Sequence, residues 1–341
     1  MGRRILICLL AWACICVWSV AALPAHAADK IVIRFGHGNA PTELDVFHTA
    51  ALKMKSKLED RLGKDRIEVQ IYPSGQLGSE ERGFQDVQQG IQQMILLAVN
   101  NASLFSPSLG AFDLPYIFKN TAEFEKCLDA NWELINRLME KESGNMAIGW
   151  VSQGFRLLTN SKKPVAKLAD LQGLKIRTPN HPIMIGVYRA WDCEPVSIAW
   201  DECFNAVQQK VVDGLDNSLM SFATNRYYEI QKYITGIHYK LWVGPLVVNA
   251  AWLRGLPEDA RRAVVEAGRE TTLEMRALVD KMNADTRKFL EGKQIVFCGT
   301  PVDEDEWARR AMAIWPRFYP QIKNLSLAEA FMKTLGRELP R

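Results

Sequence analysis

The chain has 341 residues, and 48% of them are hydrophobic, enough for a sizeable core. With 42 basic and 39 acidic side chains, the net charge is +3 at pH 7, which gives no indication of nucleic-acid or lipid-surface binding. The length predicts about two domains.

The N-terminal residues differ from the rest of the chain. Arg3 and Arg4 precede an apolar stretch, residues 5–20, and small residues surround a cleavage site after Ala27. This order is typical of a secretory signal peptide. The stretch is short for a membrane span, which needs roughly 20 residues, so a retained anchor is the weaker interpretation. Residues 1–27 are therefore predicted to be a leader, and its removal leaves 40 basic against 39 acidic side chains.

The cysteines outside the leader do not form a metal-binding pattern. Cys127, Cys193, Cys203 and Cys298 include no C-x-x-C pair and no neighbouring histidine cluster, so neither a metal nor a cofactor is expected. Export would permit a disulfide between Cys193 and Cys203, the only nearby pair. Burial as small apolar side chains is the favoured alternative.

The first part of the mature chain predicts a β-α-β-α-β series. Strands are expected at residues 30–35, 67–72 and 94–99, and helices at about 43–62 and 80–90. The first helix would begin at a capping box formed by Thr42 and Asp45. Its apolar stripe comprises Leu44, Phe47, Ala51, Met54, Leu58 and Leu62. This order favours a largely parallel sheet covered by helices.

A second α/β unit follows. Its expected strands are residues 145–152, 155–159, 174–177 and 193–198, and its expected helices are residues 182–191 and 201–210. A long helical stretch then begins near Leu256, with an apolar stripe of Ala260, Val264, Ala267, Thr271, Met275, Leu278, Met282 and Phe289. At about 1.5 Å per residue it would be near 50 Å long, and it should cross both domains. A strand at 294–298 and a helix at 303–320 complete the series.

Catalytic motifs are absent from the sequence. It contains no G-x-G-x-x-G, no G-x-x-x-x-G-K-[ST], no H-E-x-x-H and no G-x-S-x-G. His48 lies on the apolar helical stripe and is expected to be packed or half-exposed. His37 lies in the loop after the first strand and is the better candidate for a ligand contact. Glu80 and Glu81 lie at a predicted helix start, where the helix dipole accounts for them. No enzyme is expected.

Two arginines at strand ends indicate anion binding. Arg156 lies near the start of the expected strand at residues 155–159, just after Gly154, and Arg177 ends another strand immediately before Thr178 and Pro179. The planar guanidinium binds a carboxylate through two parallel hydrogen bonds. On composition alone, a surface arginine or an internal ion pair is the alternative for each.

Six segments together carry a family resemblance. The chain resembles the C4-dicarboxylate-type (DctP) solute-binding proteins of tripartite ATP-independent periplasmic (TRAP) transporters, and the segments occur in family order over nearly the whole mature chain. They are Tyr72-Pro-Ser-Gly-Gln-Leu-Gly-Ser-Glu80, Leu114-Pro-Tyr116, Gly154-Phe-Arg-Leu-Leu-Thr-Asn160, Asp170-Leu-Gln-Gly-Leu-Lys-Ile-Arg-Thr-Pro179, Val212-Asp-Gly-Leu-Asp-Asn217 and Leu256-Pro-Glu-Asp259.

The resemblance implies an α/β fold like that of type II periplasmic binding proteins, with two domains, a hinge and a long helix that spans both. We expect one domain from residues 28–153 plus 242–281, and the other from 154–241 plus 282–341. The implied protein is a periplasmic monomer that binds a small organic acid and delivers it to the TRAP membrane permease subunits.

The resemblance also implies the site residues. Arg177 would be the main carboxylate clamp, Arg156 a second or water-mediated contact, and Asn217 a hydrogen-bonding partner of the carboxylate or of an adjacent hydroxyl. Trp200 would stack on the apolar body of the ligand. The alternatives are a structural Arg156, a local turn at Asn217 and a core tryptophan.

From the first domain, the loop of residues 37–41, with His37, should face the same cleft, and so should Asn100 and its neighbour Asn101. Trp242 is a further candidate, with core packing as the alternative. In members that recognise sugar acids, an acidic residue can stand near the end of the third strand. Here residues 97–100 contain none, which favours a compact or partly apolar carboxylate.

Two other classes of function remain open at this point. One is an extracytoplasmic ligand-sensing module. The other is a hydrolase or lyase on a similar scaffold, against which the missing catalytic constellation argues.

Overall fold

The computed structural model describes residues 30–340. The predicted leader, residues 1–27, lies outside this range. Within residues 30–340, no helix is both long enough and apolar enough to cross a membrane.

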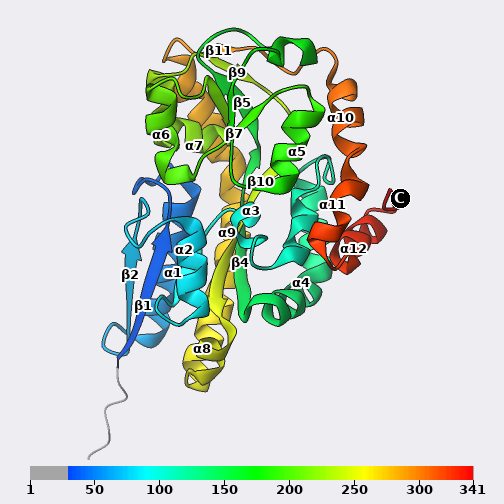
Figure 1. Cartoon of the computed structure of the whole chain (residues 1–341). Helices are drawn as coiled ribbons and strands as arrows, with labels where there is room; N and C mark the ends of the chain where they lie inside the picture. Colours follow the sequence, from blue (N-terminus) through cyan, green and yellow to red (C-terminus); the bar gives the residue numbers. More distant parts are fainter. Residues whose placement is uncertain (1–29, 341) are drawn as a thin grey trace, which may run out of the picture.

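The chain forms two mixed sheets that belong to two lobes (Figure 1). The first sheet has the order β2-β1-β3-β10-β4, and the second has the order β11-β9-β5-β8-β6-β7. The strands are β1 (Ile31–His37), β2 (Ile67–Tyr72), β3 (Met94–Leu96), β4 (Asn145–Phe155), β5 (Leu157–Asn160), β6 (Ile176–Thr178), β7 (Pro195–Ser197), β8 (Gly214–Asn217), β9 (Tyr233–Thr235), β10 (Leu241–Asn249) and β11 (Val296–Phe297).

Helices cover both sheets. They are α1 (Val46–Leu62), α2 (Glu80–Gln88), α3 (Val99–Ala102), α4 (Thr121–Ser143), α5 (Pro182–Ala190), α6 (Trp200–Gln208), α7 (Leu219–Thr224), α8 (Ala250–Gly255), α9 (Glu258–Glu291), α10 (Glu304–Met312), α11 (Trp315–Ile322) and α12 (Ser326–Thr334). Short 3-10 helices η1 (Pro107–Asp113), η2 (Leu168–Leu171) and η3 (Tyr227–Glu229) join them.

The β-α-β-α-β prediction for the first lobe is confirmed, with β1 parallel to both β2 and β3. The predicted capping box is wrong, because Asp45 itself caps α1 by accepting hydrogen bonds from the backbone N–H groups of Phe47 and His48, at 2.8 and 3.2 Å. An Asp at N-cap satisfies donors that the first helical turn leaves unpaired. Leu44 therefore precedes the helix and is 54% exposed, outside the buried stripe.

Strands cross between the lobes at two places. β4 continues into β5 through Arg156, and the segment after β9 continues through Lys240 into β10, which pairs with β4 in antiparallel fashion. The backbone N–H of Arg156 donates to the carbonyl oxygen of Lys240, at 3.0 Å, so the two crossings lie side by side. The strand pattern predicted β4 and β5, but it missed β8, β9 and β10.

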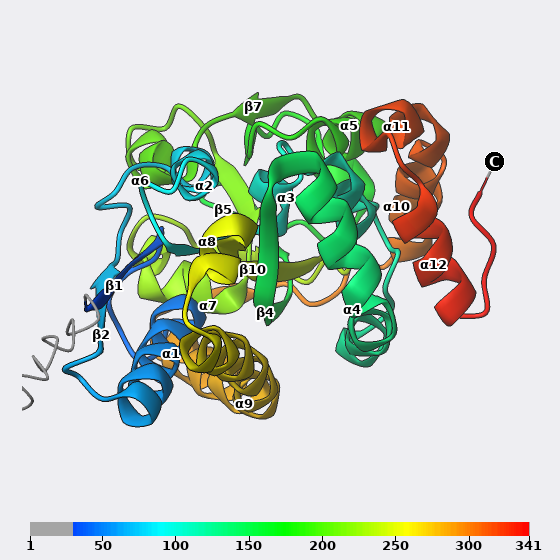
Figure 2. The same cartoon turned by 90° about the horizontal axis from the view of Figure 1, so that it is seen from below.

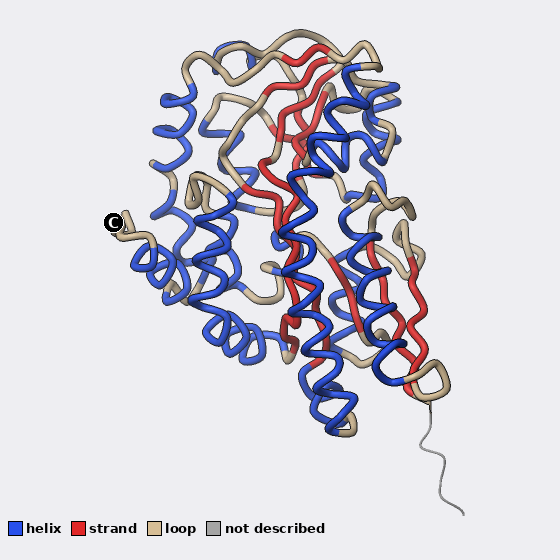
Figure 3. The backbone as a smooth tube through the Cα atoms, turned by 180° about the vertical axis from the view of Figure 1, so that it is seen from behind, coloured by secondary structure: helices blue, strands red, loops and turns tan. Residues whose placement is uncertain are grey.

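The long predicted helix is confirmed as α9, which contacts both lobes and runs along the strands in Figure 3. Two glycines permit its close approach to β4. A Cβ on Gly268 would lie 2.4 Å from the carbonyl oxygen of Ile148, and one on Gly149 would lie 2.7 Å from the carbonyl oxygen of Gly268. Phe289 is 41% exposed, against its expected place on the buried stripe, because the buried face near the end of α9 passes through Thr286 and Leu290 instead.

The predicted helix at residues 303–320 is two helices, α10 and α11, with a break near Ile314. α10 contacts α5 and η2 of the second lobe. In contrast, α12 packs on α4 and η1, and α11 packs on η1, so the chain end lies against the first lobe (Figure 2). The C-terminal helices therefore connect the two lobes.

Candidate functional site

A small cavity lies between the two lobes. The space between its lining atoms, mouth included, is about 340 Å³, at the small end of ligand pockets. The lining residues are Asn39, Glu80, Ala98, Asn100, Asn101, Arg156, Arg177, Pro179, Trp200, Asn217, Ser221 and Trp242. The structure thus brings together six of the seven predicted site residues, and both lobes contribute.

Arg177 is the central cation of the cavity. It lies in β6, between β7 and β8, and Pro179 follows the strand. The side chain is almost fully buried, and its Nε donates to the carbonyl oxygen of Ile198, at 2.8 Å. No carboxylate within residues 30–340 pairs with it, and its terminal nitrogens have no hydrogen-bond partner there. The terminal nitrogens of this guanidinium are therefore free to donate hydrogen bonds to an anion in the cavity, and Arg177 also acts through space to lower the pKa of Glu80.

Trp200 and Asn217 flank Arg177. Trp200 begins α6, and its ring centre lies 5.8 Å from the guanidinium carbon of Arg177. Asn217 ends β8, and its side-chain oxygen accepts from the backbone N–H of Ser218, at 2.8 Å. Its amide nitrogen has no partner among the described residues. Asn217 therefore makes the local contact considered above and still offers a donor to the cavity.

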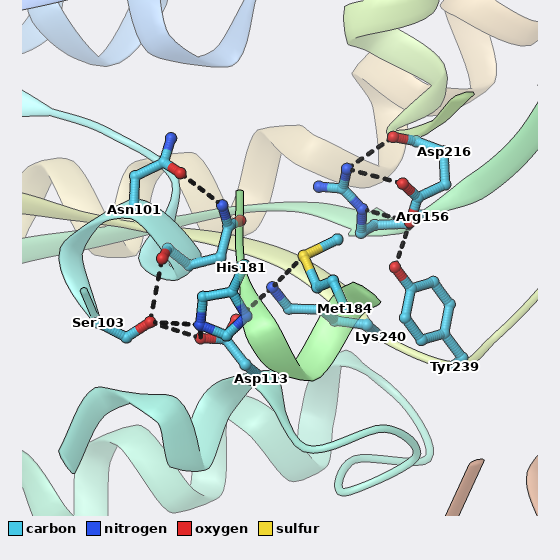
Figure 4. Close-up of polar contacts among 10 residues, drawn as sticks. Asn101, Ser103, Asp113, Arg156, His181, Met184, Asp216, Tyr239 and Lys240 are labelled. Atoms are coloured by element: carbon cyan, nitrogen blue, oxygen red, sulfur yellow. Dashed lines mark hydrogen bonds and ion pairs between the residues drawn. The ribbon is translucent and has the colours of Figure 1, made fainter. Parts of the chain in front are cut away.

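Arg156 is held in an ion pair beside the cavity (Figure 4). Its Nε donates to Oδ2 of Asp216, at 2.9 Å, and its Nη2 donates to the carbonyl oxygen of Asp216, at 2.6 Å. The hydroxyl of Tyr239 donates to Oδ2 of the same aspartate. Since Asp216 neutralises Arg156, Arg177 is the stronger site for an anion. Arg156 has the structural role proposed as its alternative and also lines the cavity.

A second buried ion pair lies close to the first (Figure 4). Nζ of Lys240 and Oδ1 of Asp113 lie 2.5 Å apart, and Nε2 of His181 lies 3.3 Å from Oδ2 of Asp113. The hydroxyl of Ser103 donates to the same Oδ2, at 2.8 Å. Burial alone would raise the pKa of Asp113, but Lys240 and His181 hold it below its ordinary value. This charge cluster joins η1, α5 and the crossing before β10.

The first lobe contributes amides and an aromatic ring. Asn39 donates to Oδ2 of Asp45, at 2.9 Å, and Asn100 donates to the side-chain oxygen of Asn101, at 2.7 Å. Trp242, in β10, packs edge-on against Phe47 with ring centres 4.9 Å apart and also lines the cavity. Trp242 is therefore packed in the core of the first lobe and also forms part of the cavity wall.

Glu80 is a cavity residue that the sequence pattern missed. It opens α2, but its carboxylate is buried, and Oε2 accepts from the backbone N–H of Ala98, at 2.9 Å, and from Nδ2 of Asn101, at 2.6 Å. Burial raises the pKa of Glu80 to about 7, although the hydrogen bonds from Ala98 and Asn101 act to lower it. The acidic group missing from residues 97–100 is thus supplied by α2. The lack of an acidic residue at 97–100 therefore does not by itself favour a partly apolar ligand, whereas Trp200 and Trp242 do line the cavity.

The structure does not place His37 at the cavity. Its ring is buried against α1, with Nε2 3.2 Å from Nδ1 of His48 and the ring of Phe47 at its edge. Burial and the neighbouring His48 lower its pKa to about 3, so the ring is neutral at pH 7. His48 is half-buried, in agreement with the packed or half-exposed side chain that was expected. Position after a strand could not distinguish an inward-facing histidine from one that faces the cleft.

The cysteines and acidic residues offer no metal centre. Cys127, Cys193 and Cys203 are buried as free thiols, and Cys298 is partly exposed. Across the described part of the chain, no cluster of three or more His, Cys, Asp or Glu side chains could hold a metal ion. Burial of Cys193 and Cys203 agrees with the favoured prediction.

Two α/β lobes that share crossing strands and enclose a cavity with an unpaired arginine define a solute-binding protein. Residues 35–321 match the model of the bacterial extracellular solute-binding proteins, family 7 (DctP), and the chain belongs to this family. These are solute-binding proteins and not enzymes.

Relatives are similar along most of their length. The chain is 30% identical over 294 residues to a solute-binding protein of Verminephrobacter eiseniae, covering 86% of this chain and 85% of the relative. It is 27% identical over 276 residues to the 2,3-diketo-L-gulonate-binding periplasmic protein of Escherichia coli, covering 80% and 82%.

Solved structures agree with the fold. An open, unliganded TRAP periplasmic solute-binding protein from Rhodobacter sphaeroides is 34% identical, with a TM-score of 0.75 over 90% of this chain and 99% of that one. A TRAP protein from Roseobacter denitrificans with bound β-D-glucuronate is 23% identical, with a TM-score of 0.82 over 88% and 98%. The predicted type II binding-protein fold, with α9 touching both domains, is confirmed.

Proposed function

We propose that this chain captures a small organic carboxylate between its two domains and delivers it to the membrane permease of a TRAP transporter. The observation that supports this most directly is Arg177, a buried cation in the cavity without a carboxylate partner in the described chain. A carboxylate of the ligand would occupy its fork through two parallel hydrogen bonds.

The other predicted contacts take supporting roles. Asn217 donates to the carboxylate or to a neighbouring hydroxyl, and Trp200 and Trp242 cover the carbon skeleton from the two domains. Arg156, already paired with Asp216, contributes a weaker or water-mediated contact, and Asn100 reaches the ligand from the first domain. His37 supports α1 and does not touch the ligand.

Capture is coupled to closure of the two domains. We place the hinge at the crossings through Arg156 and Lys240, with residues 28–153 plus 242–281 on one side and residues 154–241 and the start of 282–341 on the other. The helices α11 and α12 follow the first domain, on which they pack. Contacts with both domains favour the closed state because only that state offers all of them.

The relatives support an acidic ligand. The Escherichia coli relative is named for 2,3-diketo-L-gulonate, and similar structures hold β-D-glucuronate, succinate and galactonate. We propose the same broad class for this chain. Residues 1–27 direct it to the periplasm, where it acts as a monomer.

Titration calorimetry with a panel of mono- and dicarboxylates tests the proposal. Loss of a buried charge-assisted contact costs roughly 2–5 kcal/mol, so Arg177→Ala should weaken binding by at least about thirtyfold while the protein remains folded. The affinity of Arg177→Lys should lie between those of wild type and Arg177→Ala, because lysine keeps the positive charge but lacks the planar group that forms two parallel hydrogen bonds. Arg189, an arginine of α5 whose side chain is 59% exposed, provides the matched control through Arg189→Ala. Unchanged affinity of Arg177→Ala would overturn the assignment.

Delivery requires a separate measurement. Proteoliposomes that contain the TRAP permease subunits should take up labelled ligand only when this protein is added, and Arg177→Ala should abolish uptake. Uptake that does not depend on this protein would favour a sensing role instead.

A further inference from the structure

Glu80 places a carboxylate in the cavity that also holds Arg177. The two charged groups belong to different domains, Glu80 to α2 and Arg177 to β6. They do not form an ion pair with each other, although each lines the cavity. The cavity therefore carries one group of each sign, and the two are near enough for Arg177 to lower the pKa of Glu80.

The carboxylate of Glu80 is fixed through one oxygen and keeps the other available. Oε2 accepts from Ala98 and Asn101. Oε1 has no hydrogen-bond donor within residues 30–340, and it lies beside Gly38, where an added Cβ would be 3.2 Å from it and 3.4 Å from Cδ1 of Trp200. Since Trp200 belongs to the opposite domain, Oε1 lies where the two domains meet over the cavity.

We propose that Glu80 determines ligand specificity by selecting carboxylates that carry a hydroxyl at the end remote from Arg177 and by rejecting those with a second carboxylate there. This inference rests on the proposed function, in which Arg177 binds the ligand carboxylate. It names hydroxylated monocarboxylic acids as the substrate class.

The physical reason is the difference between the two ends of such ligands. At pH 8, above its pKa of about 7, Glu80 is mostly ionised and only accepts hydrogen bonds, so a ligand hydroxyl donates to Oε1 and satisfies it. A ligand carboxylate offers no donor and places a like charge beside Glu80 in a cavity screened less than water. A buried polar acceptor left without a donor adds a further cost.

Substitution by glutamine inverts this selection with little change in shape. In Glu80→Gln, the amide oxygen takes the place of Oε2, because Ala98 and Asn101 both donate there. The amide NH₂ then occupies the place of Oε1 and donates. A second ligand carboxylate becomes an acceptable partner, whereas a ligand hydroxyl must accept instead of donate.

The test uses acids matched in length, with CH₂OH exchanged for a terminal carboxylate. The probes are 4-hydroxybutanoate against succinate and gluconate against glucarate, titrated by calorimetry at pH 8 into the full mature chain. The wild-type protein should bind the better monoacid at least about tenfold more tightly than its diacid partner, and Glu80→Gln should reduce that ratio by at least about tenfold. Glu81→Gln, the neighbouring carboxylate of α2, is the control and should leave the ratio unchanged.

Two results would overturn the inference. One is a wild-type protein that binds each diacid as tightly as its monoacid, and the other is a Glu80→Gln variant that keeps the wild-type ratio. The Arg177→Ala variant separates this failure from failure of the proposed function. If binding depends on Arg177 but the ratio does not depend on Glu80, only the role of Glu80 is wrong. If no acid binds, or if binding ignores Arg177, both proposals fail.

Discussion

Replacement of Lys240 by methionine should destabilise the protein more than any surface charge substitution. Lys240 is 4% exposed and Asp113 is fully buried, so the substitution leaves a buried carboxylate with only the Ser103 hydroxyl and the His181 ring as partners. Breaking a buried pair from one side costs roughly 3–5 kcal/mol. We expect a loss of about 3–5 kcal/mol in the free energy of unfolding at pH 8.

The loss should become smaller as the pH falls. In the wild-type protein, burial and the nearby Lys240 lower the pKa of His181. Without Lys240, Asp113 raises that pKa, and a protonated His181 replaces the missing cation. The folded variant then binds more protons than its unfolded chain, so its deficit shrinks between about pH 7 and pH 5.

Urea unfolding followed by tryptophan fluorescence measures both effects, provided that the slope against denaturant stays constant. The double variant Asp113→Asn with Lys240→Met removes both charges and should recover to within about 1 kcal/mol of wild type. Lys281, whose side chain is 74% exposed in its pair with Asp285, is the control, and Lys281→Met should cost less than about 1 kcal/mol. A Lys240→Met variant as stable as this control, or a double variant no better than the single ones, would refute the reasoning.

Three further outcomes can be measured on the unliganded protein. Burial raises the pKa of Glu80 from 4.5 to about 7, so the folded state loses stability as the pH rises through that range. The free energy of unfolding of Glu80→Gln should exceed that of wild type by about 3 kcal/mol at pH 8 and by almost nothing at pH 4, and equal differences at both pH values would contradict this. Gly268→Ala should lower stability by about 1–3 kcal/mol in thermal unfolding because its Cβ would meet β4, whereas Gly255→Ala, with open space around it, should not. Cys298 should react with a thiol reagent in the native state, whereas Cys193, whose pKa burial raises to about 11, should react only after unfolding; rapid labelling of Cys193 would contradict its placement.

The sequence predicted the elements whose pattern is local. Period-two apolar alternation located β1 and β2, and the helical stripe located α1 and most of α9, because these patterns report which side of one element is buried. The arginine before Thr178 and Pro179 was identified in the same way. Arg177 lies one residue before the end of β6, and side chains near a strand end are those that a fold can expose to a cleft.

Local patterns failed where a partner distant in the sequence decides the outcome. β8 and β10 are buried on both sides and carry no alternation, so only their pairing with other strands defines them. The single helix expected at residues 303–320 breaks near Ile314 because α11 turns to pack on η1.

The sequence by itself determined the class of this protein, because six short segments in fixed order and the arginines within two of them can be recognised without knowledge of the fold. The tertiary structure decided which side chains share the cavity. His37 and Glu80 show why. Both lie where a loop meets a regular element. The ring of His37 packs against α1, whereas the carboxylate of Glu80 accepts hydrogen bonds from Ala98 and Asn101, which follow β3. The direction of a side chain depends on donors and surfaces brought from elsewhere in the chain, and no local pattern encodes them.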